Sequence, residues 1–308
     1  MNSEQAARLL ALARESRLLG PEASKWEERL LPLRTEISEA VRFLTGTGEP
    51  DAAVELAACL WRLWLSVGDV AGGRRMLAMA LDGPRPEPTR SRALALYGDG
   101  LLAFRAGAMP ESRARNEEAL QVARDIRDQE SESLALVGLS RVALRDGDYD
   151  RVCSLATHAR ELVRGLHAAA DVSPLHLLAV GTRLSGDYDA AARLYSDSLR
   201  LNERLGDRRM VGMELFNLAH VELHRGNIPE AQRLFTESAR ICNRQDPYEE
   251  AMTHLGAAAL ALAERQNERA KELLERTRST LEGAGIVLDP DDAFEVRWLQ
   301  ERLAPRAG

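Results

Sequence analysis

Lysine and aromatic residues are scarce in this chain of 308 residues. Of its 41 basic residues only Lys25 and Lys271 are lysines, and we interpret the arginine excess as the codon bias of a GC-rich genome. Aromatic residues make up 5% of the chain, but 45% of it is apolar, which is too much for a disordered protein. The net charge of −7 argues against direct binding to nucleic acid.

Long apolar runs are missing as well. No segment approaches the roughly 18 consecutive apolar residues that a membrane-spanning helix needs. The first five residues have neither a basic flank nor an apolar core, so we expect no secretory signal. Cys59, Cys153 and Cys242 lie far apart without metal-ligand spacing, which predicts buried thiols in a reducing compartment. We therefore expect a cytoplasmic protein without a membrane partner.

Motifs of catalysis and of cofactor binding are not found either. The chain has no glycine-rich phosphate loop ending in Gly-Lys, no Gly-x-Ser-x-Gly turn and no His-Glu-x-x-His. Asp289, Asp291 and Asp292 lack the ligand spacing of a calcium loop, so they are interpreted as helix-capping residues. The sequence predicts a non-catalytic protein that needs no cofactor.

What the chain does have is an internal repeat with a period of about 40 residues. Glycines in helix-breaking contexts recur at intervals of 39 or 40 positions, and an Asp or Asn follows most of them. A glycine just past a helix end adopts the left-handed conformation without strain, and the Asp or Asn then caps the next helix. Each glycine therefore predicts a tight turn between two antiparallel helices: Gly68, Gly107, Gly147, Gly186 and Gly226.

The segments around these turns have the apolar spacing of helices. A small residue stands five positions after several of the glycines, as at Gly73, Ser112 and Ala231, which predicts a close approach of the two helices. No alternating run of strand length occurs. We predict an all-α solenoid of helix hairpins, with a degenerate sixth turn at Gln266-Asn267.

The pattern resembles the tetratricopeptide repeat (TPR), as Leu218-Ala219, Gly226-Asn227, Ala231 and Phe235 illustrate. HEAT repeats have a similar length, but the Gly-Asp turn followed by alanine favours the TPR. The segment Leu60-Trp61-Arg62-Leu63-Trp64, with Gly68 after it, further resembles the TPR region of MalT-like and AfsR-like bacterial transcriptional regulators, which are STAND ATPases. This resemblance implies a right-handed superhelix that serves as the interaction or sensor arm of a regulatory system.

The expected organisation is a single solenoid over residues 1–308. Two N-terminal helices occupy residues 1–50, about six hairpins follow over residues 51–285, and a helix over 289–303 caps the apolar end. The cap begins after Asp289-Pro290, where proline suits the first turn of a helix.

The resemblance also implies which side chains line the concave groove, because the first helix of each hairpin faces it. These side chains are mostly basic, aromatic or apolar, and the groove is predicted to bind a protein or an acidic peptide, or a small anion, through arginine. The predicted residues are Arg62, Tyr97, Phe104, Arg105, Arg141, Arg145, His176, Arg183, Phe216, His220 and His224, with Asn217 beside them.

Several alternatives stay open at this point. Arginine could simply fill exposed helix positions in an arginine-rich chain, without a groove function. A second hypothesis is a sensor of a small molecule or signalling peptide that changes the superhelical pitch. A third is a metal site or enzyme based on His176, His220 and His224. Trp61 and Trp64 are interpreted as hairpin core, with self-association as the alternative.

Overall fold

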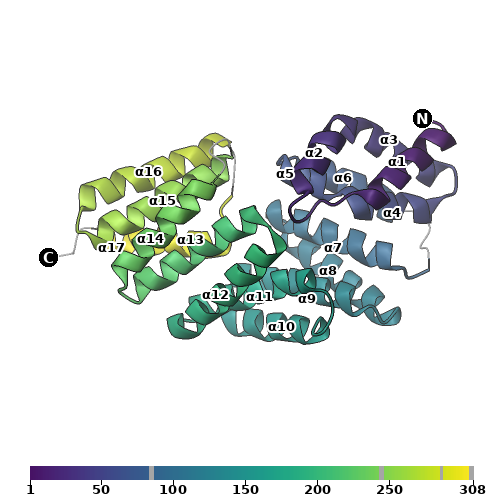
Figure 1. The fold of residues 1–308 in the computed structure, drawn as a ribbon. Helices are drawn as coiled ribbons and strands as arrows, with labels where there is room; N and C mark the ends of the chain where they lie inside the picture. Colours follow the sequence, from purple (N-terminus) through teal and green to yellow (C-terminus); the bar gives the residue numbers. More distant parts are fainter. Residues whose placement is uncertain (83–86, 243–245, 285–286, 305–308) are drawn as a thin grey trace. The chain divides into compact units, whose positions relative to one another are not determined.

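The computed structural model describes residues 1–82, 87–242, 246–284 and 287–304, and the regular elements in these ranges are all helices (Figure 1). The predicted all-α fold of helix hairpins is therefore confirmed. The predicted end of the last hairpin at residue 285 lies outside the described residues.

Among the described residues, no helix combines the length and the apolar character needed to cross a membrane.

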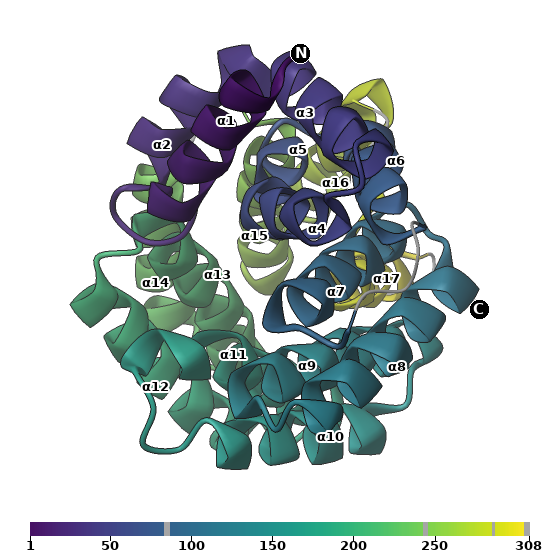
Figure 2. The same cartoon turned by 90° about the vertical axis from the view of Figure 1, so that its right-hand side faces the viewer.

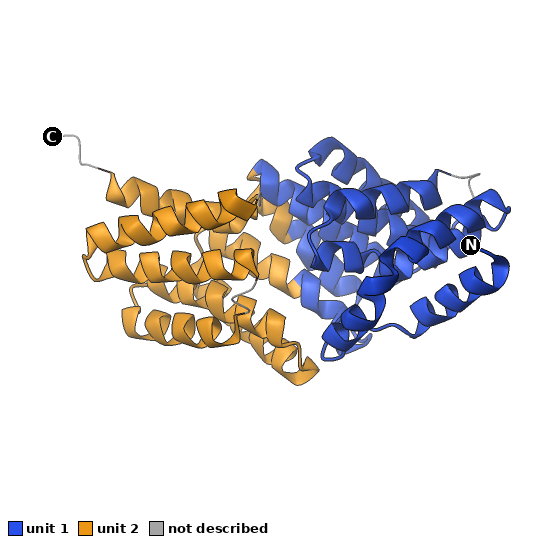
Figure 3. Ribbon diagram, turned by 90° about the horizontal axis from the view of Figure 1, so that it is seen from above, with its two compact units in different colours: residues 1–146, 154–174 blue, residues 147–153, 175–308 orange. Residues whose placement is uncertain are grey.

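The chain divides into two compact units (Figure 3). Unit 1 comprises residues 1–146 and 154–174, and unit 2 comprises residues 147–153 and 175–308. Two helices, α10 (Tyr149–Leu162) and α11 (Val172–Leu184), contribute residues to both units.

Unit 1 begins with three α-helices and one 3-10 helix in the segment for which the sequence predicted two helices, so that prediction is wrong. The break at Leu30 explains the difference, because the Leu31-Pro32-Leu33 turn separates two helices there. The helices of unit 1 are α1 (Ser3–Glu15), α2 (Ala23–Leu30), η1 (Leu31–Leu33), α3 (Arg34–Gly46), α4 (Pro50–Leu60), α5 (Arg62–Ser66), α6 (Val70–Leu81), α7 (Arg90–Arg105), α8 (Met109–Asp125), α9 (Gln129–Asp146) and η2 (Ala168–Asp171).

Unit 2 contains the later hairpins and the C-terminal helix. In both units, consecutive helices lie side by side as antiparallel pairs, which Figure 2 shows for α7 with α8 and for α13 with α14. The helices of unit 2 are α12 (Tyr188–Leu205), α13 (Arg208–His224), α14 (Ile228–Ile241), α15 (Pro247–Ala263), α16 (Asn267–Ala284) and α17 (Pro290–Leu303).

The turn glycines behave as predicted. Gly68, Gly107, Gly147, Gly186 and Gly226 all have φ between 72° and 89°, in the left-handed region. Aspartates after them cap the next helix, since Asp69 and Asp187 accept from the backbone N–H three residues on. In the sixth turn the left-handed residue is Arg265 (φ 62°), one position before the predicted Gln266.

Small residues allow the hairpin helices to approach closely. A Cβ placed on Gly73 would lie 2.8 Å from Cβ of Trp64 and 2.7 Å from Leu102. Ser112 is fully buried, and its Oγ donates to the carbonyl oxygen of Gly100 over 2.8 Å. Any larger side chain at these positions would force the paired helices apart.

The hairpin cores are apolar and closely packed. Trp61 and Trp64 are buried, as their interpretation as core residues requires. The three cysteines are free thiols, but each is only partly buried, so the prediction of buried thiols is wrong. Burial raises the pKa of the Cys59 thiol and of the Cys153 thiol, which keeps both in the unreactive protonated form.

Candidate functional site

In unit 1, four of the predicted groove residues contact one another or a shared aromatic ring. The guanidinium carbon of Arg62, at the start of α5, lies 4.2 Å from the ring centroid of Trp61. The Trp61 ring packs edge-on against Tyr97 of α7, with 6.0 Å between the centroids. Further along, the guanidinium carbon of Arg145 in α9 lies 5.0 Å from the ring centroid of Phe104 in α7. Arginine on an aromatic face is a favourable cation–π arrangement.

Arg141 completes this group, which we call the arginine cluster: Arg62, Tyr97, Phe104, Arg141 and Arg145. Arg141 is close enough to Arg62 for their positive charges to repel each other. Burial lowers the pKa of Arg62, the Tyr97 ring opposes this, and the charge of Arg141 lowers the pKa further. Arg62 therefore lies in a site that would favour a negative charge beside it.

No carboxylate pairs with Arg62 or Arg141 within the described ranges. Other arginines of unit 1 do have such partners, for example Arg90 with Asp128 and Glu130. Nη1 of Arg141 is buried and lacks a hydrogen-bond partner among the described residues. Arg105, which the sequence also assigned to the groove, is exposed at the end of α7.

In unit 2, three of the predicted groove residues, Arg183, His220 and His224, contact carboxylates of the C-terminal helix α17. Nη1 of Arg183 donates to Oε1 of Glu295 over 3.0 Å, and its Nη2 donates to Oδ2 of Asp291 over 3.3 Å. The side chain of Arg183 is 0% exposed and that of Glu295 is 1% exposed. Burial opposes the charge of Arg183, but Tyr195 and the two carboxylates raise its pKa above the usual value.

Two histidines of α13 contact the other oxygen of the same carboxylate. Nδ1 of His220 lies 3.3 Å and Nε2 of His224 lies 2.9 Å from Oε2 of Glu295. Burial alone would raise the pKa of Glu295, but His220, His224 and Arg183 lower it overall. We call Arg183, His220, His224, Asp291 and Glu295 the carboxylate cluster.

Aromatic rings enclose His224. The Tyr188 ring stacks on it with 4.9 Å between centroids and 15° between planes. From α17, Trp298 meets it edge-on at 4.8 Å and Phe294 at 6.3 Å. Alpha17 therefore contacts α13 through aromatic side chains as well as through a carboxylate.

The remaining predicted residues of unit 2 do not contact the carboxylates of α17. His176 contacts Glu214, with 3.0 Å between Nδ1 and Oε1, and Ser198 donates to the same oxygen over 2.7 Å. Phe216 packs edge-on against His220 at 4.7 Å between centroids. Asn217, which was predicted to contact a peptide backbone, is only 2% exposed.

Asp291 and Asp292 do not cap α17, so their interpretation as capping residues is wrong. Both point into the buried side of the helix, where Asp291 meets Arg183 and Asp292 accepts from the Tyr248 hydroxyl of α15. Burial and the nearby Asp291 raise the pKa of Asp292 well above its usual value, despite that hydrogen bond.

The carboxylate cluster joins one arginine and two histidines to a single glutamate. The ligand atoms of His220, His224 and Glu295 lie within 4.8 Å of one another, a spacing that a metal ion could use. However, Arg183 holds the same carboxylate, and its positive charge opposes a cation at this position. His176, which the sequence offered as a third metal ligand beside His220 and His224, contacts Glu214 instead. The group that lies beside the two histidines is Glu295.

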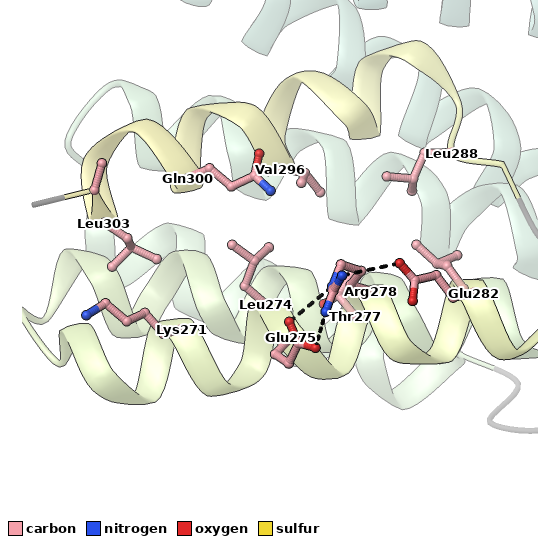
Figure 4. Close-up of a pocket in the computed structure, with 12 residues that line it drawn as sticks. Lys271, Leu274, Glu275, Thr277, Arg278, Glu282, Leu288, Val296, Gln300 and Leu303 are labelled. Carbon is pink, nitrogen blue, oxygen red and sulfur yellow. Dashed lines mark hydrogen bonds and ion pairs between the residues drawn. The ribbon is translucent and has the colours of Figure 1, made fainter.

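An open, mostly apolar cavity of about 600 Å³ separates α17 from α16 (Figure 4). Leu274 of α16 and Val296 and Leu303 of α17 point into it. The side of α17 that faces α16 therefore lacks the close packing of the other helix pairs.

Comparisons with known proteins identify the fold. No family model and no curated protein matches the chain. Among solved structures, a Rap protein complexed with competence and sporulation factor has a TM-score of 0.63 and 12% identity, over 96% of this chain and 80% of that one. NprR in complex with its cognate peptide NprX has a TM-score of 0.59 and 15% identity, over 96% and 82%.

A third similar structure is the STAND protein PH0952 from Pyrococcus horikoshii, which has a tetratricopeptide repeat sensor. Its TM-score is 0.63 at 13% identity; the match covers 98% of this chain but only 42% of that one. The repeat, the left-handed turn residues and these likenesses agree, and the chain has the fold of the tetratricopeptide-repeat proteins.

Proposed function

We propose that the chain is a binding module that takes an acidic segment of a peptide or protein against the arginine cluster of unit 1. The observation that carries this proposal is the pair Arg62 and Arg141, which repel each other and have no carboxylate partner among the described residues. An acidic side chain between them would relieve the repulsion and form charge-assisted hydrogen bonds.

The aromatic residues of the cluster add specificity to this binding. Arg62 packs on the Trp61 ring, which Tyr97 supports, and Arg145 packs on the Phe104 ring, so these guanidinium groups are positioned before a ligand arrives. Positioned donors lose less conformational entropy on binding than free ones do. Two of the similar structures contain competence and sporulation factor or a cognate peptide, which supports a peptide as the ligand class.

Selection from a random peptide display library tests this proposal. Peptides selected on the wild-type chain should be enriched in Asp and Glu. They should bind the Arg62→Glu, Arg141→Glu double variant at least about tenfold more weakly, since charge-assisted hydrogen bonds contribute about 1.5–3 kcal/mol each. The matched control is Arg113→Glu, an arginine of the second helix α8 that pairs with Asp146. Selected peptides without acidic enrichment, or equal binding to the double variant, would refute the proposal.

A small anion is the second candidate ligand, because the two guanidinium groups alone could hold one. Calorimetric titration of the full chain with inorganic phosphate and with citrate separates this possibility from peptide binding. Binding of either anion that is lost in the double variant would assign the site to a small-molecule sensor. In the regulatory setting that the sequence resemblance implies, either ligand would be the signal that this arm reads.

A further inference from the structure

The C-terminal helix α17 has an unusual buried face. Its buried residues are Asp291, Asp292, Glu295 and Leu299, so three of the four are acidic. A helix that simply caps a solenoid buries apolar side chains against the last hairpin. The pattern on α17 is instead that of an acidic ligand on a basic surface.

The partners of this face lie on three different helices of unit 2. Arg183 comes from α11, His220 and His224 come from α13, and Tyr248 comes from α15. Alpha17 thus makes polar contacts with the first helices of three successive hairpins. These include positions that the sequence assigned to the peptide-binding groove.

Two features keep the net strength of this attachment low. Burying charged groups costs desolvation free energy, so buried ion pairs fix which surfaces meet more than they add to stability. On its other side, α17 faces the open apolar cavity next to α16 (Figure 4). A second helix that carried the same carboxylates could therefore replace it.

We propose that α17 is an exchangeable ligand of unit 2 and that an acidic helix of a partner protein replaces it on the carboxylate cluster. The partner helix carries carboxylates at the four-residue spacing of Asp291 and Glu295 and an aromatic residue at the position of Trp298. This surface is separate from the arginine cluster, so the inference does not depend on the function proposed for unit 1.

Exchange can be measured on the full chain after a protease site is inserted next to Val287. The probe is a fluorescently labelled synthetic peptide of residues 287–304, followed by anisotropy before and after cleavage. While α17 is tethered its effective concentration is high, of the order of millimolar. We therefore expect the probe to bind the cleaved chain at least about tenfold more tightly than the intact one.

Two control peptides test whether the carboxylates are recognised. One carries Asp291→Asn and Glu295→Gln, and the other has the same composition in scrambled order. Both should bind at least about tenfold more weakly than the probe. Circular dichroism of the cleaved chain should retain the helical signal, which shows that unit 2 stays folded.

Three results would overturn the proposal. The first is a cleaved chain that keeps its own helix and never takes up the probe. The second is loss of the helical signal on cleavage, because α17 would then be part of the folding core. The third is equal binding of the probe and the two control peptides.

Discussion

Arg183 and Glu295 lie 112 positions apart in the chain, yet Nη1 of the arginine donates to Oε1 of the glutamate over 3.0 Å. Neither side chain reaches solvent, and His220 and His224 contact the second oxygen of the same carboxylate. One glutamate of the C-terminal helix therefore neutralises a buried arginine and fixes two histidines.

Removal of this carboxylate should destabilise unit 2 strongly. Glu295→Ala leaves Arg183 buried without its main partner, which costs about 3–5 kcal/mol for a buried pair. Replacement of both partners, as in Arg183→Met with Glu295→Leu, should recover most of that loss. Urea unfolding of the full chain, followed by circular dichroism, measures both effects.

The control for this measurement is Glu272→Ala, which removes an exposed ion pair with Arg276. It should change the free energy of unfolding very little, since exposed pairs contribute little. If Glu295→Ala behaved like this control, the buried network would have no role in stability.

The stability of unit 2 should also depend on pH through His220. Burial lowers the pKa of His220 below its usual value, although Glu295 opposes the shift. The unfolded chain therefore takes up a proton at a higher pH than the folded chain does. The contribution of His220 is fully present above about pH 6.5 and is lost as the pH falls, by up to about 1.4 kcal/mol per pH unit.

His220→Gln should remove this part of the pH dependence. The free energy of unfolding is measured between about pH 7.5 and pH 5.5 for both chains, and the difference between the two curves isolates the histidine. We expect the wild-type chain to lose more stability than the variant over this range. Parallel curves would contradict the burial of a neutral His220.

Zinc binding to the carboxylate cluster should be weak in the wild-type chain. Arg183 occupies Glu295 and places a positive charge next to the two histidines. Arg183→Gln should therefore strengthen zinc binding, while His220→Gln in the same background should abolish it. Calorimetric titration with zinc at neutral pH gives both affinities, and stoichiometric micromolar binding by the wild-type chain would contradict this view.

Much of the fold could be predicted from the sequence because its signals are local. The turn glycines have an unusual backbone conformation that few other residues adopt, and they repeat in register. The break of the N-terminal segment at Leu30 was missed, because a Leu-Pro-Leu turn has no counterpart in the repeat. Arg265 was missed as the sixth turn residue, because arginine rarely takes a left-handed conformation.

The sequence predicted the basic residues of the carboxylate cluster but not the acidic ones. Arg183, His220 and His224 follow from the groove positions that the resemblance to the tetratricopeptide repeat implies, since they lie on the first helices of their hairpins. Asp291 and Glu295 could not be predicted as members of the cluster. Their contacts with Arg183 join residues about a hundred positions apart and depend on where α17 packs. One signal was present: the acidic residues of α17 are spaced so that they share a helix face.

The proposal that unit 1 binds acidic segments is tested most directly by locating a bound peptide. Hydrogen–deuterium exchange of the full chain is compared with and without an acidic peptide selected on it. The account predicts slower exchange in α5, α7 and α9, which carry the arginine cluster, and no such protection in the Arg62→Glu, Arg141→Glu variant. Protection confined to the second helices α6 and α8, or protection that survives in the double variant, would contradict it.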